Sequence, residues 1–101
     1  MDISKICNAL GNEHRYQIVK SLKEKTIGTC CDRIQYFENG LSVADVVATT
    51  GLAQSTVSQH LAVLEQAGVI LREKRSQWTC FFLNKELLEE FSREVQKALC
   101  E

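Results

Sequence analysis

Residues 52–69 read LAQSTVSQHLAVLEQAGV and contain the clearest structural signal in the chain. A helix is predicted over residues 54–66, because a step of about 100° per residue puts its apolar side chains on one face. These side chains are Val57, Leu61 and Leu64. A shorter amphipathic helix over residues 42–50 precedes it, separated by the turn Gly51-Leu52-Ala53. Two short helices joined by a glycine-containing turn predict a helix-turn-helix.

The opposite side of the second helix carries small and neutral hydrogen-bonding side chains. They are Ser55, Ser58, Gln59 and Ala62, with Thr56 and His60 on the flank. No acid occurs on this helix before Glu65, so nothing on this side would repel phosphate. Glutamine can read adenine, and serine or threonine can reach phosphates or bases. An ordinary solvated helix would instead carry Glu–Lys pairs four residues apart. The pattern therefore favours a helix that enters the major groove of DNA.

A β-hairpin is predicted directly after this helix. The strand-like run Val69–Leu71 leads into a polar tip, Arg72–Gln77, and then into the aromatic-rich run Trp78–Leu83. The tip has three cations and one acid. Beside a recognition helix, a basic hairpin serves as a wing that grips the DNA backbone or minor groove. A solvated turn is the alternative interpretation.

Local signals mark the ends of the predicted helices. Ser42 and Asp45 form a variant of the capping box, Asn12 and Asn84 can cap the second and last helices, and Gly51 and Gly68 stop the helices of the helix-turn-helix. Ala53, at the start of the recognition helix, offers no side-chain cap. Residues 28–40 show no clear period and are expected to form a loop or an irregular hairpin.

The whole chain, residues 1–101, is expected to form a single winged helix-turn-helix domain. Its class is mostly α (α+β), with about five helices and one hairpin. The first helix, over residues 3–10, and the last, which follows Asn84, both carry apolar stripes. A 101-residue monomer could not easily cover both stripes, so they predict a homodimer built through these two helices.

Composition narrows the class of function. The net charge of −1 argues against binding nucleic acid by bulk electrostatics, so a DNA surface must be a local patch. Neither a signal peptide nor a membrane span is evident, which predicts a cytoplasmic protein without a membrane partner. The five cysteines are an odd number and are expected to be reduced thiols.

The sequence resembles the ArsR/SmtB family of repressors. The resemblance rests on ALGNEHRYQI at residues 9–18, on residues 52–69, and on WTCFFLN at residues 78–84. It covers nearly all of the chain except residues 26–40. It implies a dimeric repressor that binds double-stranded, palindromic operator DNA and is released by an inducer. The expected DNA contacts are Gln54, Ser55, Thr56, Ser58, Gln59 and His60 on the helix, and Arg72, Lys74, Arg75 and Gln77 on the wing.

The sensing sites of the family are not reproduced. Its arsenic-type C-x-C motif would fall at Ser42 and Ala44, and its zinc-type site needs a histidine that residues 84–101 lack. The adjacent thiols Cys30 and Cys31 remain, and such a pair can chelate a soft ion such as As(III). Cys7 or Cys100 could supply a third sulfur, whereas Cys80 fits buried packing. A redox or persulfide switch is the second interpretation, and two incidental small residues are the third.

Two other functions are alternatives to a repressor. A winged-helix protein-interaction module without DNA binding would be favoured by reversed charge on the recognition helix, which is not seen. A thiol oxidoreductase needs C-x-x-C at a helix start in a βαβ setting, and neither is present. The chain is therefore expected not to be an enzyme and to need no obligatory cofactor, with a thiophilic ion as its inducer.

Overall fold

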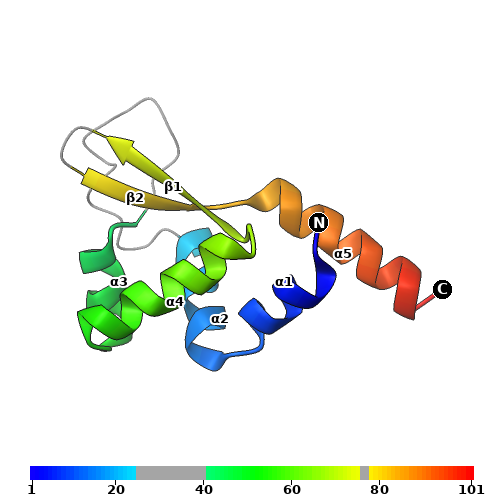
Figure 1. Ribbon diagram of the computed structural model, residues 1–101, viewed down its shortest axis with the longest axis horizontal. Helices are drawn as coiled ribbons and strands as arrows, with labels where there is room; N and C mark the ends of the chain where they lie inside the picture. The colour runs from blue at the N-terminus through cyan, green and yellow to red at the C-terminus, as the bar shows by residue number, and fades with distance from the viewer. Residues whose placement is uncertain (25–40, 76–77) are drawn as a thin grey trace.

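The computed structural model describes residues 1–24, 41–75 and 78–101. Within these ranges the chain forms five helices and one antiparallel hairpin, as predicted (Figure 1). In chain order they are α1 (Ile3–Leu10), α2 (Glu13–Glu24), α3 (Val43–Thr50), α4 (Gln54–Gln66), β1 (Ile70–Arg75), β2 (Trp78–Leu83) and α5 (Lys85–Leu99). The hairpin lies at one end of the molecule, and α5 extends beside α1 toward the other end.

The predicted helix ends are confirmed. The Asp45 amide donates to Oγ of Ser42 at 3.2 Å, and the Ser42 amide donates to Oδ2 of Asp45 at 3.0 Å, which completes a capping box. Asn12 and Asn84 each accept an amide hydrogen bond in the first turn of α2 and of α5. Gly51 ends α3 in the left-handed region, with φ of 73°, where glycine has no steric penalty.

The end of α4 directs the chain into the wing. The Gly68 amide donates to the Glu65 carbonyl at 2.9 Å, and the Val69 amide donates to the Leu64 carbonyl at 3.0 Å. These two bonds form a Schellman motif, with Gly68 at φ of 80°. A Cβ at Gly68 would lie 3.1 Å from Cδ1 of Leu87, a tight contact that a small shift of the Leu87 side chain would have to relieve.

One core joins the helix-turn-helix to the remaining elements. The three apolar residues predicted to face inward from α4 are all buried, at 1% exposure or less. They pack with buried side chains from α1, α2, α3 and the hairpin: Ile6, Ala9, Ile18, Leu22, Val46, Ile70 and Phe81. Burial of this apolar surface fixes which side of α4 faces solvent.

The hairpin is longer than predicted. The sequence pattern ends the first strand at Leu71 and puts residues 72–77 at the tip, but β1 continues to Arg75, which pairs with Trp78. Backbone pairing with β2 extends the strand through residues whose side chains are charged, because ladder hydrogen bonds do not require apolar side chains. Most of the basic run therefore lies along the wing and not at its tip.

Leu41 adds a further connection to the wing. Its amide donates to the Phe81 carbonyl at 3.0 Å, and the Phe81 amide donates back to the Leu41 carbonyl at 2.8 Å. Leu41 directly precedes the N-cap of α3. The start of the helix-turn-helix is thus hydrogen-bonded to β2.

α5 packs loosely in a single copy of the chain. None of its residues is buried, and Leu99 is 78% exposed. A groove of about 490 Å³ lies between α1 and α5. Its lining is mainly apolar: Ile3, Cys7, Phe91, Ser92, Glu94, Val95, Ala98 and Leu99. Among the described residues, no helix combines the length and the apolar character needed to cross a membrane.

Candidate nucleic-acid interface

The outward side of α4 carries the helix residues that the sequence predicted to contact DNA. Gln54, Ser55, Ser58 and Gln59 are exposed, while Thr56 and His60 are half-buried at the flank. We call these six residues the reading face. Val57 is completely buried on the opposite side of the same helix. The reading face contains hydroxyl, amide and imidazole groups and no carboxylate, so its chemistry suits phosphates and base edges.

The first turn of α4 also lacks a side-chain cap. Ala53 has the extended backbone of an N-cap residue, but its side chain makes no hydrogen bond. The first amides of a helix have no intrahelical acceptor, and they lie at the positive end of the helix dipole. Uncapped amides at this position are suited to a phosphate oxygen.

His60 has an environment that disfavours its charged form. Partial burial lowers the pKa of His60 from its ordinary value, and the positive charges of Arg15 and His14 lower the pKa further. The rings of His14 and His60 are 6.0 Å apart and tilted by 33°. His60 is therefore neutral near pH 7.

The basic residues of the wing differ in what they contact. Nη2 of Arg72 lies 3.0 Å from Oε1 of Glu65 on α4, and its guanidinium carbon is 5.4 Å from the centre of the Phe81 ring. Lys74 is exposed further along β1. Arg75 is the last residue of β1, and Gln77 lies outside the described residues.

Of the four cysteines proposed as ligands, the structure describes Cys7 and Cys100. Cys30 and Cys31 lie outside the described residues. Cys7 on α1 and Cys100 at the end of α5 are exposed, and Cys80 is fully buried, as its packing role predicted. Within the described residues, no three His, Cys, Asp or Glu side chains lie close enough together to hold a metal ion.

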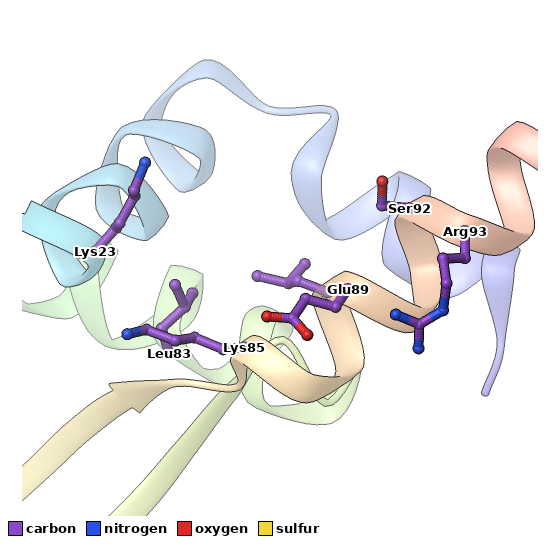
Figure 2. A pocket seen from close by; sticks show the side chains of 7 residues that line it. Lys23, Leu83, Lys85, Glu89, Ser92 and Arg93 are labelled. Carbon is purple, nitrogen blue, oxygen red and sulfur yellow. The ribbon is translucent and has the colours of Figure 1, made fainter.

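A second depression was not predicted from the sequence. It has a volume of about 560 Å³ and lies where α2, the end of β2 and α5 meet (Figure 2). Its lining residues are Lys23, Leu83, Lys85, Leu88, Glu89, Ser92 and Arg93. Three cations and one carboxylate give it no affinity for a thiophilic ion, because it contains no sulfur or imidazole ligand. Lys23 is about sixty residues from the others, so no local pattern could reveal it.

Comparison with known proteins agrees with this geometry. Residues 37–71 match the family model for bacterial regulatory proteins of the arsR family. The chain is 30% identical over 89 residues to YbzH, an uncharacterised HTH-type transcriptional regulator of Bacillus subtilis, covering 87% of this chain and 89% of YbzH. The chain belongs to the ArsR family. The resemblance seen in the sequence is thereby confirmed, and so is the expectation that the chain is not an enzyme, because ArsR-family proteins are transcriptional regulators.

Other ArsR-family proteins extend the comparison. The chain is 34% identical over 73 residues to ArsR2 of Halobacterium salinarum, whose name refers to an arsenical resistance operon repressor. The match covers 72% of this chain and 51% of ArsR2, so the chain spans about half the length of that relative. An ArsR-like regulator from Rhodococcus sp. RHA1 superposes with a TM-score of 0.74 at 14% identity, covering 95% of this chain and 77% of that one. The homodimeric winged helix-turn-helix domain of Mb0332 from Mycobacterium bovis gives a TM-score of 0.68 at 18% identity, with the same coverage.

Proposed function

We propose that this ArsR-family regulator is a homodimeric repressor that binds a palindromic operator. The observation that carries the proposal is the reading face of α4. It is free of carboxylates and is exposed except at its flank, while Val57, Leu61 and Leu64 anchor the opposite side in the core. A helix held in this way can enter the major groove with its N-terminal residues toward the bases. The exposed Lys74 and the neighbouring Arg75 would add backbone contacts from the wing.

The α1–α5 groove supports the dimer. Phe91, Val95 and Leu99 present apolar surface there that one copy leaves accessible, and Ile3 faces them from α1. A second copy related by twofold symmetry would cover both stripes at once. Two reading faces related by the same symmetry would then match the two halves of a palindrome. The solved homodimer of Mb0332 has the same fold.

We infer that the inducer is a thiophilic ion, with As(III) preferred. Adjacent Cys30 and Cys31 supply two thiolates, and Cys7 or Cys100, both exposed on the helices of the proposed interface, supplies a third. Binding there would favour a dimer conformation with lower affinity for DNA. The name of the halobacterial relative, which refers to arsenical resistance, agrees with this choice of ion.

Selection of duplexes from a random pool, followed by gel shift at several salt concentrations, tests DNA binding. We expect one palindromic sequence, here called the selected duplex, to be enriched and bound more tightly than random DNA. Gln59→Ala should weaken binding to the selected duplex by roughly 10-fold or more while leaving random DNA unaffected. Gln17→Ala is the matched control, because Gln17 is an exposed glutamine on α2. It should change neither the affinity for the selected duplex nor that for random DNA. If no sequence is enriched, DNA recognition by this surface is excluded.

Titration of the reduced protein with arsenite, Zn(II), Cd(II) and a persulfide donor tests the inducer. We expect arsenite to release the selected duplex, and Cys30→Ser and Cys31→Ser to abolish that release. Cys7→Ser and Cys100→Ser identify the third ligand. Release by the persulfide donor alone would establish the redox alternative, and an unchanged arsenite response in all four variants would exclude a cysteine site.

A further inference from the structure

Arg15, in the first turn of α2, binds the end of α1. Its Nε donates to the Ala9 carbonyl at 2.8 Å, and its Nη2 donates to the Asn8 carbonyl at 3.1 Å. Both carbonyls belong to the last turn of α1, where the helix dipole is negative and the usual donor four residues ahead is missing; the Asn8 carbonyl also accepts the Gly11 amide at 3.2 Å. A guanidinium suits this position, because its planar fork can donate to several acceptors at once.

The same guanidinium reaches the recognition helix. Nη1 of Arg15 lies 3.5 Å from Nδ1 of His60. Because arginine has donors only, Nδ1 must be the acceptor in this contact. The proton of the neutral imidazole is then on Nε2, which makes no hydrogen bond to any residue that the structure describes. The lowered pKa of His60 is consistent with a neutral ring at this position.

We propose that Arg15 is a positioning residue that fixes the reading face relative to the dimer interface. The inference rests on the proposed function, in which α1 belongs to the interface and α4 reads the operator. Through its hydrogen bonds to Asn8, Ala9 and His60, Arg15 joins α1, α2 and α4. In a dimer, the angle between α1 and α4 sets the separation of the two reading faces, which must match the spacing of the operator half-sites. Arg15 also keeps the Nε2 proton of His60 available for an acceptor on DNA.

Arg15→Lys tests the proposal, because lysine retains the charge and loses the fork. We expect affinity for the selected duplex to fall by about 10-fold and affinity for random DNA to change by less than about 2-fold, since non-specific binding depends on charge. Lys20→Gln is the control, because it removes a cation from the exposed side of the same helix. Its ratio of selected to random affinity should equal that of the wild type. Sedimentation and thermal unfolding establish that each variant is a folded dimer.

A double-mutant cycle tests whether Arg15 acts through His60. In a His60→Ala background, Arg15→Lys should cost less in operator affinity than it does in the wild type, because the contact is already lost. If the fold losses of Arg15→Lys and His60→Ala simply multiply in the double mutant, the proposal is overturned. If Arg15→Lys does not fold, His60→Asn and His60→Leu replace the cycle. Asparagine keeps an acceptor near the position of Nδ1, so it should retain more operator affinity than leucine, and equal losses would refute the contact.

A failure of the proposed function can be distinguished from a failure of the positioning role of Arg15. A wild-type protein that shows no preference for any duplex contradicts the proposed function. A wild-type protein that discriminates, together with an Arg15→Lys protein that discriminates equally well, contradicts the positioning role alone.

Discussion

Nη2 of Arg72 on β1 lies 3.0 Å from Oε1 of Glu65 in the last full turn of α4, which links the wing to the recognition helix. The side chains are 54% and 34% exposed, so the ion pair contributes no more than about 1 kcal/mol to stability. The larger consequence is electrostatic. The carboxylate of Glu65 offsets the charge that Arg72 could offer to a phosphate.

Arg72 and Lys74 should therefore differ in their contribution to DNA binding. Lys74→Gln is expected to reduce the slope of log affinity against log salt by about 1, as for a direct phosphate contact. Arg72→Gln should reduce it by less, because Glu65 already neutralises that cation. Gel shifts of the selected duplex over a range of salt concentrations measure both slopes. Equal reductions would show that Arg72 leaves Glu65 when DNA binds.

The stability of the protein should fall in mild acid because of His60. Its pKa in the folded protein lies below the ordinary value of 6.5, so the unfolded chain binds a proton first as the pH falls. The free energy of unfolding should accordingly decrease from about pH 6.5 downward and level off below the folded-state pKa. His60→Asn cannot titrate and should lose this part of the decrease. Urea unfolding between pH 7.5 and 5 measures the effect, and identical pH profiles for the two proteins would contradict it.

The proposed dimer should be sensitive to charge in the α1–α5 groove. Val95→Glu places a carboxylate among Ile3, Phe91 and Leu99, where burial in an interface would be costly. We expect a shift from dimer to monomer in sedimentation and a fall in operator affinity of roughly 100-fold, because two linked reading faces would be separated. Gln96→Glu adds the same charge at an exposed neighbouring residue outside the groove and should keep the dimer. A Val95→Glu dimer would exclude this interface.

A side-chain cap at the start of α4 should increase the stability of the protein. Ala53 already has the backbone conformation of an N-cap, so Ala53→Ser is expected to raise the free energy of unfolding by about 1 kcal/mol. Ala48→Ser is the control, because Ala48 is exposed inside α3 and serine there should lower stability by about 0.5 kcal/mol. Urea denaturation distinguishes the two. A destabilised Ala53→Ser protein would mean that the hydroxyl does not reach the amides of the first turn.

The sequence predicted those features that depend on neighbouring residues. The capping box of Ser42 and Asp45, the left-handed Gly51 and the inward face around Val57 are all local signals, and all are confirmed. The length of β1 was underestimated, because Arg72 to Arg75 enter the strand by pairing with β2 and not through their own propensity. Charged side chains along an exposed ribbon look the same in sequence as a solvated turn.

Contacts between distant residues could not be predicted. The sequence identifies Arg15 only as part of a motif, because its partner His60 is 45 residues away. The depression between α2 and α5 joins Lys23 to residues of the C-terminal third of the chain for the same reason. The reading face was predicted because all six residues lie on one helix, whereas a cysteine site would have to gather residues from several segments.

The pair of hydrogen bonds between Leu41 and Phe81 has a consequence for how the molecule opens. They join the two ends of a stretch of forty residues that contains α3, α4 and β1, so we expect them to be lost when those elements come apart. Native-state hydrogen exchange at these two amides should therefore report a single cooperative opening, with the helix-turn-helix and its wing lost together. A single opening would place the wing in the same folding unit as the helices, and a fragment that stops before β2 would lack the strand that completes the hairpin.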